Sequence, residues 1–227
     1  MSICIIPARS GSKRIKNKNI KKINEDPLIG IVIKIAKKAN IFKKIIVSTD
    51  SKKISNISKR YGAEVPFLRN KKLSGDHTPL FKVLQDVVKR IKTSEKFIFC
   101  LFPTAILTRA SDLKRSLVLI KKKRADHLCA VKKIDNNIVR ATVKEGKYLK
   151  YLQPKFQLKM SQELPDLFLD AGCFYIFKKT SLLKINTRKP MPKKTIDYLI
   201  DYNRAIDINY PKDLILSKKI FKKLRLK

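Results

Sequence analysis

The sequence predicts an α/β domain in which a mostly parallel sheet is covered by helices on both faces. Short apolar, β-branched segments alternate with segments of helical periodicity over the first 134 residues, as in sheets built with right-handed crossovers. The chain has 227 residues, of which 44% are hydrophobic, and this is enough for one core without disulfides or a structural metal. No apolar run approaches the roughly 18 residues that a membrane span needs. We therefore expect a single domain over residues 1–227 and no membrane segment.

The first part of the chain supplies five expected strands and four expected helices. The strands are short apolar runs, and the helices carry apolar residues three and four positions apart. Gly62 ends the second helix, and Thr108 or Ser111 is expected to cap the fourth. The expected strands are residues 2–7, 44–48, 63–68, 96–102 and 128–133, and the expected helices are residues 29–39, 52–61, 80–91 and 110–120.

The pattern changes after about residue 134. Turn signals at residues 136–137 and 145–147 predict a hairpin of two strands, residues 138–143 and 148–152. A further strand is expected at residues 172–177, another short strand just before Asp207, and a closing helix that Pro211 begins. We therefore expect an inserted β element at about residues 134–170 within the single domain.

The charge of the chain indicates affinity for polyanions. Lys and Arg number 54 and Asp and Glu number 18, so the formal net charge is +36. The basic residues are spread along the whole chain, and no basic run is interleaved with aromatic residues that would stack on bases. This favours a nucleoside triphosphate as the specific partner, with nucleic acid bound only weakly and without sequence preference. A nucleic-acid-binding protein remains the alternative function.

The cysteines and the N-terminus bear on the compartment. The four cysteines form no C-x-x-C pair, so we expect buried free thiols in a reducing cytoplasm; they are Cys4, Cys100, Cys129 and Cys173. The first residues, MSICIIPARSGSKR, lack the basic start and the cleavage site of a secretory signal. Both observations favour a cytoplasmic protein.

Residues 5–19, IIPARSGSKRIKNKN, are the segment that carries chemistry. They follow the first strand, where an open α/β sheet places its ligand. Small residues at positions 10–12 let backbone N–H groups approach phosphate oxygens, and the surrounding cations neutralise them. The spacing is neither that of a Walker A loop nor G-x-G-x-x-G. Taken locally, the segment is either a phosphate-binding loop or a solvated basic turn.

This segment resembles P-A-R-x-G-S-K-x-x-x-x-K-N, the nucleotide-binding signature of the sugar-activating cytidylyltransferases. Four more blocks agree with that family in order and spacing. They are residues 46–50 (IVSTD), 61–69 (YGAEVPFLR), 76–78 (DHT) and 204–209 (RAIDIN). The last block lies where the family has its metal-binding D-x-D. The resemblance covers nearly the whole chain, roughly residues 2–220.

The resemblance implies a Rossmann-like, glycosyltransferase-A-like nucleotidyltransferase with three α/β/α layers. It implies that CTP and a nine-carbon 2-keto acid sugar react to give a CMP-sugar and pyrophosphate, with Mg²⁺ as the cofactor. It further implies a homodimer that uses the inserted β element as a dimer arm, and a role in flagellin or surface-glycan modification. No acyl- or phospho-enzyme is needed, so catalysis falls to positioning and charge stabilisation.

The family motifs assign roles to individual residues. The catalytic candidates are Arg9, Lys18 and Asp207. The nucleotide-binding candidates are Ala8, Arg9, Ser10, Gly11, Ser12, Lys18, Asn19 and Arg69. The sugar-binding candidates are Arg140, Gln162, Asp170 and Phe174, and the metal candidates are Asp207 and Asn209. On local grounds alone, Asp207 is equally a turn former or helix cap, and Arg140 is equally an exposed hairpin residue.

The identity of the sugar depends on weaker motifs. Residues 161–164 (SQEL) and 170–175 (DAGCFY) resemble the pseudaminic acid branch of the family, and legionaminic or N-acetylneuraminic acid is the alternative. The chain departs from the family at three positions, Met160, Cys173 and Asn209. The family usually has a second Asp at the last of these, so a member that binds CTP and turns it over poorly is a further alternative.

Overall fold

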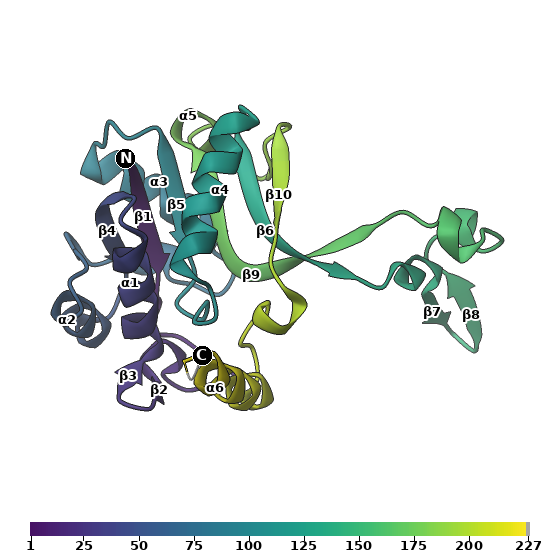
Figure 1. Cartoon of the computed structure of the whole chain (residues 1–227), viewed down its shortest axis with the longest axis horizontal. Coiled ribbons are helices and arrows are strands. Elements are labelled where there is room, and N and C mark those ends of the chain that lie inside the picture. The colour runs from purple at the N-terminus through teal and green to yellow at the C-terminus, as the bar shows by residue number, and fades with distance from the viewer. Residues whose placement is uncertain (226–227) are drawn as a thin grey trace.

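The computed structural model describes residues 1–225 and is organised around a six-stranded sheet with the order β10-β6-β9-β5-β1-β4 (Figure 1). All neighbouring strands run parallel except β9, which is antiparallel to both β5 and β6. The strands are β1 (Ser2–Pro7), β4 (Phe42–Ser48), β5 (Phe97–Leu101), β6 (His127–Ile134), β9 (Leu167–Lys178) and β10 (Thr195–Leu199). This arrangement confirms the mostly parallel sheet that the sequence predicts.

Helices cover both faces of the sheet because its strands are apolar on both sides. In β1, Ile3 and Ile5 pack into one core cluster, whereas Cys4 and Ile6 pack into the other. The first cluster includes side chains of α3 (Leu80–Ile91) and α5 (Lys179–Leu182). The second includes side chains of α1 (Leu28–Ala39), α2 (Lys52–Arg60), α4 (Ala110–Lys122) and α6 (Pro211–Arg225). The three-layer architecture is therefore confirmed.

The helix ends follow local chemistry. Asn40 ends α1 in the left-handed conformation, which Asn tolerates better than most residues. The Ser51 hydroxyl accepts a hydrogen bond from the backbone N–H of Ile54 and caps α2. The N-cap of α4 is Arg109, between the two caps expected from the sequence, and its backbone N–H donates to the Asp112 carboxylate at 2.8 Å.

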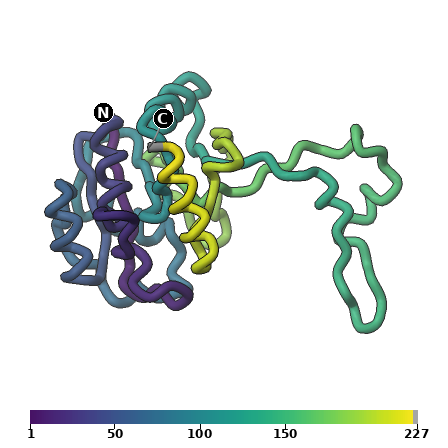
Figure 2. Tube along the Cα trace, turned by 60° about the horizontal axis from the view of Figure 1, so that its bottom comes forward, coloured from purple at the N-terminus to yellow at the C-terminus, as the bar shows by residue number. Residues whose placement is uncertain are grey.

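Residues 135–166, which we call the arm, project away from the sheet (Figures 1 and 2). The far ends of β6 and β9 leave the sheet as a two-stranded ribbon that pairs Ile134 with Leu167. The arm carries the hairpin of β7 (Thr142–Glu145) and β8 (Tyr148–Tyr151), in which every residue is exposed. Three 3₁₀ segments complete it: Asn136–Arg140, Pro154–Phe156 and Ser161–Glu163.

Four details differ from the expected elements. Residues 63–68 form no strand, because only Glu64 bridges to Ile46 of β4. The first hairpin strand starts at Thr142, since the Asp135 side chain caps a 3₁₀ turn over Asn136–Arg140. β10 was not expected, because its sequence TIDYL is short and partly polar. The residues just before Asp207 form a loop that follows the 3₁₀ turn Tyr202–Arg204.

Smaller elements shape the loops around the sheet. The 3₁₀ turn Lys18–Ile20 leads into a short antiparallel pair, β2 (Lys22–Ile23) with β3 (Asp26–Pro27), and another turn covers Lys71–Leu73. All four cysteines are free, as the sequence predicts; three of them are buried as expected, whereas Cys129 is only half-buried. No helix within residues 1–225 is long and apolar enough to cross a membrane.

Candidate active site

A cleft of about 620 Å³ opens at the carboxyl ends of β1 and β5. Four segments line it: the loop after β1, the connection from Arg69 to α3, the residues after β5, and the loop that precedes α6. β4 follows β1 in the chain and lies on one side of it, whereas the next strand, β5, lies on the other side of β1. The strand order therefore reverses at this point of the sheet. Open α/β sheets bind ligands at such a point.

The mouth of the cleft holds two cations and a carboxylate. Asp76 accepts from Arg9 at 2.5 Å and pairs with Lys13 at 2.6 Å. Hydrogen bonds from Lys13 and Arg9 lower the pKa of Asp76 to about 2, so this carboxylate is ionised throughout the neutral range. The expected nucleotide contact Arg9 and the neighbouring Lys13 are thus both directed at one anionic group of the protein itself.

The loop after β1 is fixed from behind. The backbone N–H and the hydroxyl of Ser10 both donate to Asp50, at 2.8 and 2.7 Å. The buried Asn19 side chain donates to the Arg9 carbonyl at 2.9 Å, and the Ala8 N–H donates to Ser48. These contacts leave Gly11 exposed on the outer side of the loop. The expected nucleotide residues 8–12 and 19 therefore form one preorganised turn.

Arg69 lies beneath this turn with its side chain buried. Its guanidinium donates to the hydroxyl and the carbonyl of Ser48, the last residue of β4, and its own N–H donates to the Thr49 carbonyl. Burial lowers the pKa of Arg69, and the nearby Asp50 charge opposes this shift. Arg69 thus lines the cleft as a fixed positive charge.

Lys18 connects the loop to the opposite wall. Its ammonium donates to the Ile208 carbonyl at 2.7 Å, next to Asp207 in the chain. Burial is the main cause that lowers the pKa of Lys18, and the charge of Asp207 opposes it. A partly desolvated ammonium that lines a cleft attracts an entering anion more strongly than a fully hydrated one does.

Asp207 reaches the cleft because Gly172 has no side chain. A β-bulge between Cys129 and Val131 interrupts the pairing of β6 with β9, and Gly172 stands there with φ +60°. A Cβ at this glycine would lie 2.9 Å from both Cβ and Cγ of Asp207. Any other residue would displace the carboxylate. The D-A-G motif of the sequence indicates that a glycine is needed at position 172, but only the structure shows that the nearby side chain is that of Asp207.

A second cleft of about 260 Å³ shares Asp207 with the first. Phe102, Asp170, Gly172 and Tyr175 line the rest of it. The Gly172 N–H and the Tyr175 hydroxyl both donate to Asp170 and orient its carboxylate. Burial and this hydrogen bond raise the pKa of Tyr175, so its hydroxyl stays protonated. The smaller cleft offers oriented polar groups beside a phenyl ring, which suits a hydroxylated ligand.

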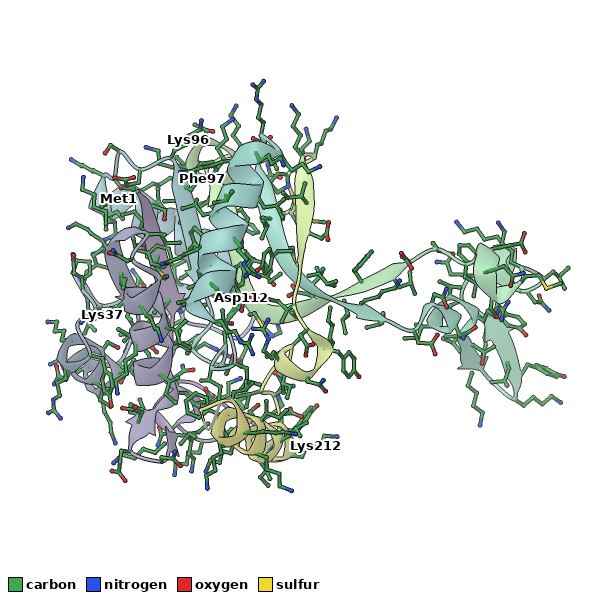
Figure 3. The ribbon with its side chains drawn as sticks, in the orientation of Figure 1. Met1, Lys37, Lys96, Phe97, Asp112 and Lys212 are labelled. Carbon is green, nitrogen blue, oxygen red and sulfur yellow. The ribbon has the colours of Figure 1, made fainter. Side chains whose placement is uncertain are left out.

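The loop before α6 is held by contacts that sequence reasoning missed. Arg204 pairs with Asp112 of α4 at 2.6 Å and donates to the Leu107 carbonyl, with both side chains largely buried. Figure 3 shows Asp112 at the lower end of α4, on the side of the connection from β10 to α6. Lys132 donates to the Ala205 carbonyl at 3.2 Å. Only tertiary contact could identify these partners, because they lie more than 70 residues apart.

Asn209, an expected metal candidate, is bonded to two charged side chains. Its carbonyl oxygen accepts from Arg14 at 2.9 Å, and its amide nitrogen donates to Asp207. The Arg14 guanidinium thus occupies one acceptor position of that oxygen. Asp207 offers an exposed carboxylate at the junction of the two clefts.

Mg²⁺ takes one or two protein carboxylates together with phosphate oxygens and water. No group of three or more His, Cys, Asp or Glu side chains within residues 1–225 could hold a metal ion. The donors therefore fit an ion that Asp207 shares with a nucleotide, and they do not fit an all-protein metal cage.

The expected sugar contacts are divided between three places. Asp170 lines the smaller cleft. Phe174 is fully buried between Phe99 and Tyr198, so its side chain packs the core and does not fit the substrate contact expected from the sequence. Arg140 and Gln162 lie in the arm, where the Arg140 guanidinium donates to the Lys159 and Asn137 oxygens. Neither arm residue lines a cleft described here.

Comparisons with known proteins agree with this architecture. A family model described as cytidylyltransferase matches residues 3–212. Pseudaminic acid cytidylyltransferase of Campylobacter jejuni is 30% identical over 97% of this chain and 96% of its own length. Post-translational flagellin modification protein B of Campylobacter coli is 32% identical over 99% and 96%. CMP-N,N'-diacetyllegionaminic acid synthase of C. jejuni is 32% identical over 91% and 89%.

The fold also matches a solved structure of CMP:2-keto-3-deoxy-manno-octonic acid synthetase complexed with CTP. The TM-score is 0.74, with 16% sequence identity over 98% of this chain and 99% of that one. At this identity the likeness concerns the fold alone.

Proposed function

The chain belongs to the cytidylyltransferase family, and on that premise we propose that it transfers CMP from CTP to a nine-carbon 2-keto acid sugar, most consistently pseudaminic acid. The observation that carries the proposal is the cationic loop of residues 9–19, which faces Asp207 across one cleft. A triphosphate needs such a cluster of positive charges, and a transferring phosphoryl group needs an ordered opposite wall. The nucleic-acid-binding alternative is not favoured by any of the relatives.

The larger cleft would hold the nucleotide. The triphosphate would take over Arg9 and Lys13 from Asp76, because Arg9 is only partly buried and Lys13 is exposed. In the turn at residues 10–12 the N–H groups of Ser10 and Ser12 already donate to Asp50 and to the Ser10 carbonyl, so the Gly11 N–H would be the one that donates to a phosphate oxygen. Arg69 and Lys18 would supply fixed positive charge further inside.

The smaller cleft would hold the sugar. Asp170 and the Tyr175 hydroxyl are placed to contact sugar hydroxyls, and Phe102 would cover one face of the ring. Both clefts share Asp207, so the anomeric hydroxyl and the α-phosphorus would meet there. In the reaction the anomeric oxygen forms a bond to the α-phosphorus, the bond to the bridging β-phosphate oxygen breaks, and pyrophosphate leaves with the negative charge. The hydroxyl proton passes to solvent.

Asp207 would hold Mg²⁺ together with phosphate oxygens of CTP. When bound, the ion would neutralise phosphate charge and help pyrophosphate to leave. Lys18 would stabilise the same charge directly, because its ammonium lies beside the Asp207 loop and keeps two further donors. Arg204 and Lys132 keep that loop in place from behind.

The proposal includes a homodimer formed through the arm. Large apolar side chains are exposed along it, with Leu158 at 94% and Leu149 at 72%. A second subunit would cover them and could bring Arg140 and Gln162 to a sugar cleft. Free, buried thiols agree with a cytoplasmic location. A relative named as a flagellin modification protein supports a role in flagellin or surface-glycan modification.

Pyrophosphate release measured with purified protein tests the proposal. We expect turnover with CTP and much slower turnover with UTP, ATP or GTP. Pseudaminic acid should be the best of three sugars, the others being legionaminic and N-acetylneuraminic acid. Equal turnover with UTP would reject the nucleotide assignment, and preference for legionaminic acid would reject the sugar. Absence of release with any pair would favour a member that binds CTP and turns it over poorly.

A further inference from the structure

Asn209 makes two side-chain contacts of opposite polarity. Its Oδ1 accepts from Nη2 of Arg14 at 2.9 Å, and its Nδ2 donates to Oδ2 of Asp207. Arginine has only donors and an ionised carboxylate has only acceptors, so the orientation of the amide is determined by its neighbours. An aspartate has no donor for Asp207, and therefore only an amide satisfies both partners at this position.

These contacts join two segments that are distant in the sequence. Arg14 belongs to the loop after β1, whereas Asp207 and Asn209 belong to the loop before α6. The hydrogen bond between Arg14 and Asn209 therefore joins residues that are 195 positions apart in the chain. The Arg14 guanidinium also stacks over the Tyr210 ring, 5.0 Å from its centroid. Asp213 accepts from the backbone N–H groups of Asn209 and Tyr210, at 2.9 and 2.7 Å. Asn209 is therefore held from both its main chain and its side chain.

We propose that Asn209 is a positioning residue and not a metal ligand: its amide connects Arg14 to Asp207 and holds the phosphate loop and the carboxylate together before the nucleotide binds. This rests on the proposed function of the cleft. Nucleotide binding then does not have to order the loop. The conformational entropy of the loop is lost when the protein folds, so its loss does not weaken nucleotide binding. The Lys18 contact to the Ile208 carbonyl is the second connection between the same two segments.

The two roles predict opposite effects of removing Arg14. If the Asn209 oxygen is a metal ligand, Arg14→Met frees that oxygen, and the protein binds a divalent ion as well as before or more tightly. If Asn209 positions Asp207, Arg14→Met and Asn209→Ala weaken binding in the same direction. The double variant is then no worse than Arg14→Met alone, because that change already removes the connection through Asn209 together with the contact to Tyr210.

The first experiment is amide hydrogen exchange of the protein with EDTA and without nucleotide. Peptides covering residues 9–21 and 205–213 should exchange about tenfold faster in Asn209→Asp, Asn209→Ala and Arg14→Met, since each loses a hydrogen bond to a charged group. Arg14→Lys keeps a donor and should restore part of the protection. Asn203→Asp is the matched control, because it makes the same chemical change at an exposed residue nearby and should leave exchange unchanged.

The second experiment measures binding of Mn²⁺ by the CTP-bound protein, and of CTP with EDTA, both without sugar. We expect Asn209→Ala and Arg14→Met each to raise the dissociation constant for CTP about tenfold, and to weaken Mn²⁺ binding by a similar factor. Unchanged exchange in both loops, or Mn²⁺ binding that Asn209→Ala weakens and Arg14→Met strengthens, would overturn the proposal. Neither readout uses sugar turnover, so a failed sugar assignment leaves the result interpretable.

Discussion

The loop of residues 9–19 and the arm both lie outside the sheet, yet they are held in different ways. The loop makes hydrogen bonds or ion pairs with Asp50, Asp76, Ile208 and Asn209, which come from three distant segments. The arm is joined to the body by the β6–β9 ribbon, and its hairpin is exposed on every residue. Side chains of the arm extend into solvent in Figure 3, with no part of the body beside them.

This difference indicates which region is complete within one subunit. Polar groups of the loop are satisfied by the same chain, and the charges left unbalanced face a cleft. The arm leaves apolar surface exposed to water. Covering this surface with another protein surface would lower the free energy of the system. Changes in the cleft should therefore act on catalysis, and changes in the arm should act on assembly.

Asp207→Ala should have the largest effect and abolish measurable turnover. It removes the carboxylate that both clefts share, while its loop remains held by Arg204 and Lys132. Asp166→Ala removes an exposed carboxylate of the arm and is the matched control. Pyrophosphate release and thermal unfolding measure the outcome. An active Asp207→Ala protein would show that the metal and the reaction centre lie elsewhere.

Lys18→Ala should lower the turnover number by about 10²–10³, the usual cost of losing one preorganised charge at a reacting centre. Unfolding should change little, because Lys18 is only partly buried and its side chain donates one hydrogen bond, to the loop before α6. Lys16→Ala in the same loop is exposed and should retain turnover. Near-normal rates for both variants would remove Lys18 from the catalytic group.

Leu149→Lys combined with Leu158→Lys should weaken self-association at least tenfold. Both side chains are exposed, so the charge is tolerated in the single subunit and costly only under a partner surface. Analytical ultracentrifugation measures association, and the unfolding temperature should stay within about 2 °C of the parent. A protein that is a monomer before the change, or a dimer of unaltered affinity after it, would refute the arm as the dimer contact.

His127 gives the smallest expected effect and tests the body end of β6. Burial against Phe177 and Tyr175 lowers the pKa of His127 to about 4, against about 6.5 when unfolded. The unfolded chain therefore binds a proton first, and stability falls as the pH falls from about 6.5 to 4. Between pH 7 and pH 5 the free energy of unfolding should therefore fall by about 2 kcal/mol less in His127→Phe than in the parent protein. Denaturant unfolding at both pH values measures this; an equal loss in both proteins would contradict it.

Much of the fold follows from sequence pattern alone. Apolar strands alternating with amphipathic helices specify the three layers, because such strands must be buried on both faces. The departures occur where partners outweigh local preference. Residues 63–68 have a strand-like sequence but only Glu64 bridges to β4, and β10 is a weak pattern that pairs fully with β6.

The site divides in the same way. The sequence by itself determined which chemical groups are available, and its resemblance to the family motifs predicted roles for the loop of residues 9–19, the arginine at position 69 and the carboxylate at position 207. The tertiary structure decided what each side chain touches: Phe174 packs the core, Asn209 gives its oxygen to Arg14, and Gly172 makes room for Asp207. A motif specifies chemical groups, whereas hydrogen-bond partners and close approaches arise only when segments remote in the chain are packed together.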